Sequence, residues 1–250
     1  MPSIAIGDIH GNLRALNDLL AQLEPTLSAR DEVIFLGDYI DRGPDSRGCI
    51  DRILRFRGES PAPVILLSGN HEDWMMKTIR DHTRHSWLLV MDAYPTIESY
   101  SADAARALRG AAREAGPEAL YGGTARLPYG AFSDALPVTH TEFFNTLKLF
   151  HETDHGVFVH AGLDTKVKDL QHQSAFALLT GTFDFLEGHR GPPLVVYGHH
   201  NNADIQDGWP NPRMSPWTIG IDTISHGVLT AVRLPDRAVI QSARHRIGDA

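Results

Sequence analysis

The sequence lacks three things: paired cysteines, an excess of basic residues and a long apolar run. Its single cysteine, Cys49, excludes an internal disulfide and a thiolate zinc cage, so we expect a reducing, cytoplasmic location. The 23 lysines and arginines against 31 aspartates and glutamates give a formal net charge of −8. That charge argues against DNA, RNA or anionic membranes as partners, because these need a basic surface. No apolar run approaches the ~20 residues of a membrane span, and residues 1–8 do not have the pattern of a signal peptide.

What is present is typical of one globular domain, which we expect to cover residues 1–250. Short apolar runs at 3–6, 32–36 and 64–67 predict buried strands. Each is followed by a segment with helical periodicity, and the leucines at 13, 16, 19, 20 and 23 form one such stripe. This alternation predicts an α/β fold with a largely parallel sheet covered by helices.

Residues 92–149 differ in composition and predict a helical insert or cap, including a short amphipathic helix over 143–150. Strand patterns return at 157–159 and 194–197. Three closely spaced strands at 218–221, 228–232 and 238–241 suggest an antiparallel sheet. Residues 209–216 are expected to form a loop.

Polar residues follow five of the predicted strands, at glycine-bounded corners. They are Asp8 and His10, Asp38, Asn70 and His71, His160, and His199. Ligand sites of open α/β sheets lie at the carboxyl ends of strands, so we expect these side chains to converge. Carboxylate, imidazole and amide donors without thiolates suit Mn, with Fe or Zn as alternatives. The donors outnumber the needs of one ion, and pairs of ions ~3.5–4 Å apart recur in phosphate-ester hydrolysis.

Three motifs carry a resemblance to a known family: Gly7-Asp8-Ile9-His10-Gly11, Gly37-Asp38-Tyr39-Ile40-Asp41-Arg42-Gly43 and Gly69-Asn70-His71-Glu72. They are similar to the signatures of the phosphoprotein phosphatase family, bacterial type, within the calcineurin-like metallophosphoesterases. His160-Ala161-Gly162 and Gly198-His199 resemble the two later metal-ligand motifs, in the same order. The resemblance implies a four-layer α/β/β/α sandwich of two mixed sheets flanked by helices, with metals at one edge.

The resemblance also implies a role for each matching residue. Two divalent metal ions are implied, the first held by Asp8, His10 and Asp38. Asp38 would bridge to the second ion, whose other ligands would be Asn70, His160 and His199. His71 would be the general acid, Asp41 would orient its imidazole, and Arg42 would bind phosphate oxygens. A hydroxide bridging the two ions would attack phosphorus in line while His71 protonates the leaving alkoxide.

Two positions depart from the family pattern. Bacterial members carry a phosphate-binding arginine between the two late histidine motifs, and this sequence has Thr182 at about that place. His189 or Arg190 could substitute for it. His200 stands where many relatives have threonine, and Asp222 follows a sixth strand. For both residues, a role beside the site and an ordinary surface or turn role stay open.

The functional prediction is a metal-dependent phosphomonoester hydrolase, with serine/threonine protein phosphatase as the first candidate. Its partner would be a phosphorylated protein, and we expect a monomer. The alternative is a nucleotide hydrolase, for example one that cleaves diadenosine tetraphosphate symmetrically, acting on a phosphorylated small molecule. A third hypothesis is a metal- and phosphate-binding regulator without turnover, which rests on the arginine absent near Thr182.

Overall fold

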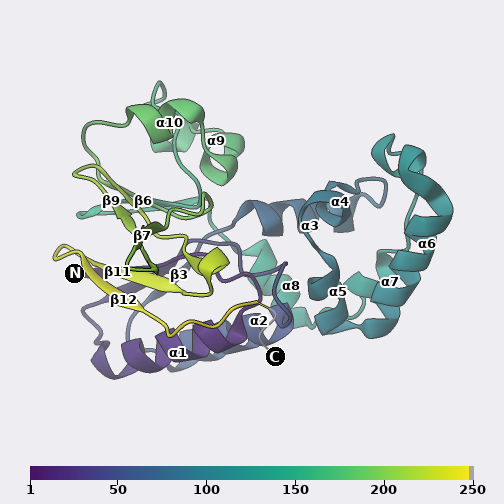
Figure 1. Ribbon diagram of the computed structural model, residues 1–250, viewed down its shortest axis with the longest axis horizontal. Coiled ribbons are helices and arrows are strands. Elements are labelled where there is room, and N and C mark those ends of the chain that lie inside the picture. Colours follow the sequence, from purple (N-terminus) through teal and green to yellow (C-terminus); the bar gives the residue numbers. More distant parts are fainter. Residues whose placement is uncertain (248–250) are drawn as a thin grey trace.

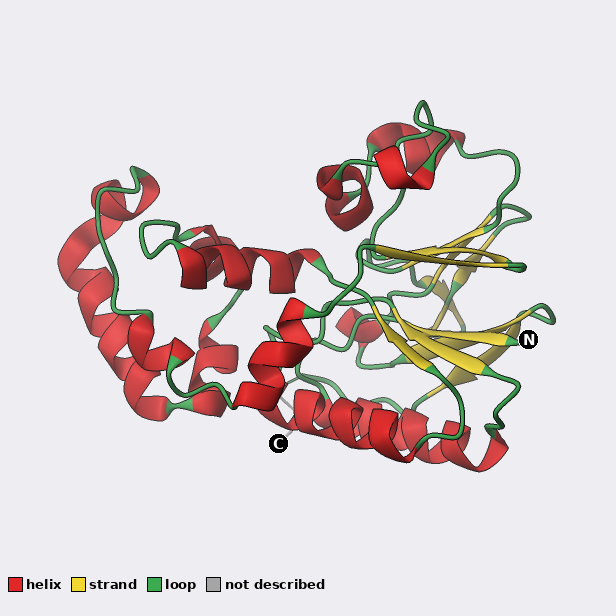
Figure 2. Cartoon of the chain, turned by 180° about the vertical axis from the view of Figure 1, so that it is seen from behind, coloured by secondary structure: helices red, strands yellow, loops and turns green. Residues whose placement is uncertain are grey.

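Two five-stranded mixed sheets lie face to face with helices on both outer sides (Figures 1 and 2). The computed structural model describes residues 1–247. The strands of the first sheet, in spatial order, are β12 (Ala238–Gln241), β11 (Thr230–Leu234), β1 (Ser3–Ile6), β2 (Glu32–Phe35) and β3 (Val64–Leu66). Those of the second sheet are β4 (Phe150–Thr153), β5 (Gly156–Val159), β6 (Val195–Tyr197), β10 (Thr218–Gly220) and β9 (Arg213–Met214). The expected four-layer α/β/β/α architecture is confirmed.

Helices cover the outer faces and also extend to one side of the sandwich (Figure 1). The α-helices are α1 (Leu13–Leu23), α2 (Ser46–Glu59), α3 (Asn70–Arg80), α4 (Ser86–Val90), α5 (Tyr94–Tyr100), α6 (Ala102–Tyr121), α7 (Gly130–Ser133), α8 (Val138–Asn145), α9 (Ala175–Thr180) and α10 (Phe183–Gly188). The described part of the chain also contains the short 3₁₀ helices η1 (Glu24–Thr26), η2 (Leu170–His172) and η3 (Ile224–His226). Within residues 1–247, no helix has both the length and the apolar character needed to cross a membrane.

The strand directions confirm the expected parallel strands of the first sheet and part of the expected antiparallel grouping near the end of the chain. In the first sheet β1, β2 and β3 are parallel, and β11 pairs antiparallel with both β1 and β12. In the second sheet β5, β6 and β10 are parallel, with β4 and β9 as antiparallel edges. The expected antiparallel grouping of the last strands is therefore wrong for β10, which belongs to the second sheet.

Alternation of side chains along each strand builds the layers. Ile4 and Ile6 of β1 pack toward the helices, whereas Ala5 faces the second sheet. In β6, Val196 faces the first sheet, and its neighbours Val195 and Tyr197 pack toward α9 and α10. The apolar layer between the sheets holds both together and fixes which strand ends meet at the common edge.

Two local expectations are wrong. The helix expected over 143–150 is instead α8, which ends at Asn145, and Phe150 begins β4. The loop expected over 209–216 contains β8 (Trp209–Asn211), which pairs with β7 (Asp204–Gln206), and β9. In both places the strand pairs with a partner that periodicity within the segment does not reveal. The helical insert at 92–149 stays a prediction; α5 to α8 lie in that range.

Candidate metal centre

Each sequence-predicted ligand lies just beyond the carboxyl end of a strand. Asp8 follows β1, Asp38 follows β2, Asn70 and His71 begin α3 after β3, His160 follows β5, and His199 follows β6. These strands belong to both sheets, so the loops meet where the two sheets present their carboxyl ends. The chain thus brings together residues that are up to 191 positions apart, as in the contact between Asp8 and His199.

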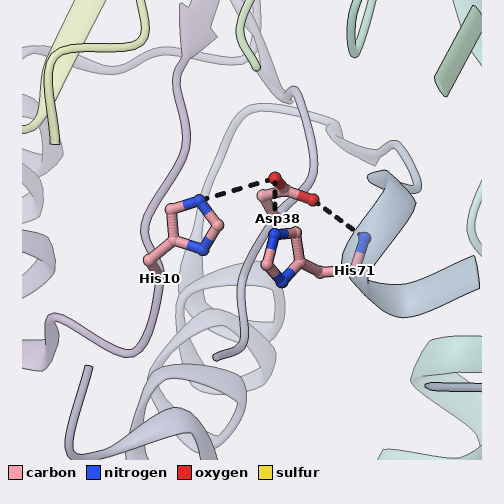
Figure 3. Close-up of side chains that lie close together, drawn as sticks. All are labelled: His10, Asp38 and His71. Carbon is pink, nitrogen blue, oxygen red and sulfur yellow. Dashed lines mark hydrogen bonds and ion pairs between the residues drawn. The ribbon is translucent and has the colours of Figure 1, made fainter. Parts of the chain in front are cut away.

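Asp38 is common to two groups of potential ligands. One group is His10, Asp38 and His71, and the other is Asp38, His160 and His199; within each group the ligand atoms lie within 4.8 Å of one another. Figure 3 shows the imidazoles of His10 and His71 directed toward the Asp38 carboxylate. Oδ2 of Asp38 is 3.5 Å from Nε2 of His10, while Oδ1 is 3.4 Å from Nε2 of His160. The two carboxylate oxygens therefore face different groups.

Asp8 and Asn70 adjoin these groups without belonging to either. Oδ2 of Asp8 lies 3.9 Å from Nε2 of His10, and both carboxylate oxygens accept hydrogen bonds from the backbone N–H of His199. Oδ1 of Asn70 is 3.0 Å from Nε2 of His160. All six predicted ligands therefore lie in one buried or half-buried cluster. His71, which was expected as the general acid, also adjoins it, with Nε2 3.8 Å from Oδ2 of Asp38.

The backbone of this cluster is in an unusual conformation. Positive φ angles occur at five residues that are not glycine: His10 (46°), Asp38 (52°), Asp41 (70°), Arg42 (65°) and His199 (65°). Each costs on the order of 1–3 kcal/mol and persists only where surrounding structure enforces it. Such strain gathers at functional sites.

Two glycines are required by close approach. A Cβ at Gly69 would collide with Oδ1 of Asp38, and one at Gly198 would collide with Oδ1 of Asp8. The glycines of the sequence motifs thus make room for the carboxylates.

The chemistry of the cluster fits a divalent cation. Nδ1 of His10 lies 2.9 Å from the carbonyl of Ile40, to which it donates, and its buried Nε2 has no hydrogen-bond partner among the described residues. An imidazole fixed in this way directs a free lone pair into the site, as metal-binding histidines do. Burial lowers the pKa of His10 and of His199 to about 3, so both are in the neutral form that binds metals.

His160 differs from His10 and His199, because its surroundings favour the protonated imidazole. Burial acts to lower the pKa of His160, but the charge and hydrogen bond of Asp38, with the charges of Asp8 and Glu72, raise it to about 9. The cluster therefore stabilises a proton on His160 among buried carboxylates. A divalent cation held by the same carboxylates would replace that proton.

A group of hydrogen-bonded side chains centred on His71 lies beside the metal-ligand cluster. Nδ1 of His71 lies 2.7 Å from Oδ2 of Asp41, and Nη2 of Arg42 lies 3.4 Å from Nε2 of His71. Asp41 also accepts hydrogen bonds from Nε1 of Trp87 (2.8 Å) and from the hydroxyl of Thr96 (2.6 Å). Burial acts to lower the pKa of His71, but Asp38 and Asp41 raise it above its usual value.

Sequence reasoning assigned no role to Glu72, although it lies in a recognised motif. Its buried carboxylate accepts hydrogen bonds from four backbone N–H groups, those of Asp38 (3.0 Å), Tyr39 (2.9 Å), Ile40 (3.3 Å) and Gly69 (2.9 Å). The loop after β2 is thereby tied to the start of α3. A glutamate three positions after a helix N-cap is a known capping signal, so the bond to Gly69 was detectable, whereas the bonds to the loop after β2 were not.

Asp222 also supports the cluster from a sixth strand end, that of β10. Its buried Oδ2 accepts from the N–H of Asn201 at 2.7 Å, and Oδ1 has no partner among residues 1–247. Burial and the nearby charge of Asp222 raise the pKa of Asp8 well above its usual value. The structure therefore favours the site role for Asp222 over an ordinary turn role.

Thr182, which stands at about the place of the family's arginine, caps the amino-terminal end of α10. The Thr182 hydroxyl donates to the carbonyl of Leu163 and accepts from the N–H of Phe185 at the start of α10. His189 bonds the carbonyl of Pro193, and Arg190 bonds the carbonyl of His189, so both make contacts within their own loop. His200 is half-buried, its ring packs against that of His199, and its Nε2 is without a partner in the described chain.

A two-sheet α/β sandwich that gathers buried carboxylates and imidazoles at its strand ends is an arrangement typical of metallohydrolases, and the groups around Asp38 could hold metal ions. The family model described as calcineurin-like phosphoesterase matches residues 1–227. The chain therefore belongs to the calcineurin-like phosphoesterase family, whose members use divalent metals.

Relatives with named activities are similar over part of the chain. A symmetrical bis(5'-nucleosyl)-tetraphosphatase from Coxiella burnetii is 32% identical over 101 residues, which cover 37% of this chain and 33% of that protein. The chain spans about a third of the length of the curated relatives it matches first.

Solved structures show the same fold at lower identity. A putative diadenosine tetraphosphatase superposes with a TM-score of 0.62 at 19% identity, covering 96% of this chain and 92% of that one. A protein serine/threonine phosphatase from Saccharomyces cerevisiae superposes with a TM-score of 0.51 at 14% identity, covering 100% and 81%. These two likenesses concern the fold, which proteins with different named substrates share.

Proposed function

We propose that this protein is a metal-dependent hydrolase of phosphate esters. The observation that carries the proposal is Asp38, whose two carboxylate oxygens face two groups of potential ligands beside the His71–Asp41 pair. Asp8, His10 and Asp38 would hold one divalent cation. Asp38, Asn70, His160 and His199 would hold the other. Two such ions supply an activated water at neutral pH and offset the charge of the phosphoryl oxygens.

The chain's own residues would bind the substrate and move the proton. The exposed guanidinium of Arg42, beside His71, suits bidentate binding of phosphate oxygens. His71 bonds Asp41 through Nδ1, which leaves Nε2 facing Arg42 and Asp38. The neighbouring carboxylates favour the protonated imidazole, so Nε2 would donate a proton to the departing oxygen.

Two substrate classes follow from different observations. Phosphoserine and phosphothreonine in proteins are the first candidate, supported by the three amino-terminal motifs and their likeness to the phosphoprotein phosphatase family. Nucleoside polyphosphates are the second, supported by the relatives from Coxiella burnetii. Both candidates use the same cluster and differ in what lies beyond the reacting phosphate.

The test is turnover of p-nitrophenyl phosphate by protein supplied with Mn²⁺, Fe²⁺ or Zn²⁺. We expect metal-dependent hydrolysis that is abolished by a chelator and lowered at least ~1,000-fold by Asp38→Asn, since loss of metal removes several kcal/mol of transition-state stabilisation. Asp134→Asn, at an exposed aspartate, is the matched control. Folded wild-type protein that is inactive with every metal overturns the proposal. Phosphate binding without turnover would then indicate the regulator hypothesis.

A further inference from the structure

The carboxyl-terminal end of α9 lies close to the loop that carries the predicted ligand His199. Gly181 ends α9 with a φ of 78°, and a Cβ at this position would lie 2.7 Å from Nε2 of His200. It would also lie 3.4 Å from the carbonyl oxygen of Ala161, the residue after His160. Both the backbone conformation and the close approach require glycine here. His200 therefore lies in contact with the end of α9 and directly follows a predicted ligand.

The imidazole of His199 packs against two other imidazoles. Its ring centroid is 5.0 Å from that of His160, at an interplanar angle of 68°, and 4.6 Å from that of His200, at 80°. Nδ1 of His199 also lies 3.2 Å from Nε2 of His160. His160 and His199 belong to the same group of potential ligands around Asp38, whereas His200 belongs to neither group. The ring of His200 thus supports His199 from outside the proposed ligand set.

Packing and a backbone hydrogen bond hold His200 itself in place. Its N–H donates to the carbonyl of Gly198 at 2.8 Å, and its ring packs against that of Tyr197, with centroids 6.2 Å apart. Tyr197 in turn packs edge-on against Phe185 of α10, at 5.2 Å. Nε2 of His200 is buried and has no hydrogen-bond partner among the described residues. The ring of His200 therefore acts through its shape and not as part of a hydrogen-bond chain.

We propose that His200 is a positioning residue for His199 and that Gly181 provides the space its ring requires; this inference rests on the metal cluster of the proposed function. The backbone of His199 is held at a positive φ of 65°, and the ring of His200 restricts the rotation of the imidazole. The side chain of His199 is thereby kept directed toward the cluster. Residues that orient a metal ligand in this way typically change metal affinity 10- to 100-fold when they are replaced.

The test is titration calorimetry with Mn²⁺, together with electron paramagnetic resonance, which distinguishes paired from single Mn²⁺ ions. We expect His200→Thr to lower the affinity for the second ion at least about tenfold and to weaken the paired-ion signal. Gly181→Ala should act in the same direction, because its methyl group displaces the ring of His200.

The kink of α6 offers a matched control for the glycine variant. Gly116 has φ and ψ angles of 75° and 163°, close to the 78° and 172° of Gly181, but a Cβ there meets nothing within 4 Å. Gly116→Ala therefore adds similar backbone strain without a collision, and it should lower Tm while keeping the wild-type Mn²⁺ affinity. Gly181→Ala combined with His200→Thr should bind Mn²⁺ about as His200→Thr alone does, because the collision needs the ring.

Three results overturn the inference: wild-type Mn²⁺ affinity in His200→Thr, no difference in Mn²⁺ affinity between Gly181→Ala and Gly116→Ala, or additive effects of the two substitutions in the combined variant. Failure of the proposed function has a different signature. Protein whose paired Mn²⁺ ions depend on His200 but which hydrolyses no phosphate ester retains the positioning residue and is not the proposed enzyme. Active protein whose Mn²⁺ affinity is independent of His200 shows the converse.

Discussion

Trp87 donates a hydrogen bond from Nε1 to Oδ2 of Asp41 at 2.8 Å, and the same oxygen lies 2.7 Å from Nδ1 of His71. Trp87 is fully buried in α4, whereas Asp41 lies in the loop after β2. Thr96 of α5 holds the other oxygen of Asp41. The helices beside the sandwich therefore fix the carboxylate that orients His71.

Trp87→Phe tests this link because it keeps an aromatic ring in the core and removes the N–H donor, although the smaller ring also leaves a cavity that lowers stability. We expect kcat to fall about fivefold, which corresponds to one net hydrogen bond, with little change in KM. The measurement is steady-state turnover of p-nitrophenyl phosphate. Trp74→Phe, at a half-buried tryptophan of α3, is the control. A change in KM alone would mean that Trp87 shapes the substrate cleft and does not position His71.

The link from Trp87 and Thr96 to Asp41 could not be predicted from the sequence. The partners are 46 and 55 positions apart, and nothing local in either helix marks them. The ligands, by contrast, were predicted as a set because each follows an apolar strand run, and parallel strands place their carboxyl ends together. The positive φ angles of His10 and Asp38 were also beyond prediction, because only the neighbouring loops impose them. The sequence thus indicates which residues can bind a metal ion, while long-range contacts set the geometry of those residues.

Cation binding should stabilise the fold. The cluster buries Asp8, Asp38 and Asp222 together, so a bound divalent ion relieves repulsion that the unfolded chain does not have. At a Mn²⁺ concentration 100 times the dissociation constant, the free energy of unfolding rises by about 2.7 kcal/mol, equivalent to about 5–10 °C in Tm. Calorimetric melting with Mn²⁺ and then with a chelator measures this. An Asp38→Asn protein that gains as much from Mn²⁺ as the wild type would place the ion elsewhere.

Glu72→Gln should destabilise the protein. The carboxylate accepts four backbone hydrogen bonds, and an amide replaces one accepting oxygen by a donor, so at least one buried N–H loses its partner. We expect the free energy of unfolding to fall by about 2–3 kcal/mol, measured by urea denaturation. Glu118→Gln, at an exposed residue of α6, should change stability by less than about 0.5 kcal/mol. Equal stability of the two variants would contradict the role of Glu72 in joining the loops.

Gly198→Ala should disable the metal cluster while leaving most of the fold intact. The added methyl would meet Oδ1 of Asp8, which the N–H of His199 holds there, so the carboxylate must leave its present position beside His10. We expect Mn²⁺ affinity to fall at least ~10-fold and turnover to fall at least ~100-fold, because small displacements in a catalytic arrangement are costly. Titration calorimetry and turnover of p-nitrophenyl phosphate measure the two effects. Gly188→Ala, where a Cβ meets nothing within 4 Å, should leave both values as in the wild type. If Gly198→Ala behaves like Gly188→Ala, Asp8 does not contribute to the metal cluster.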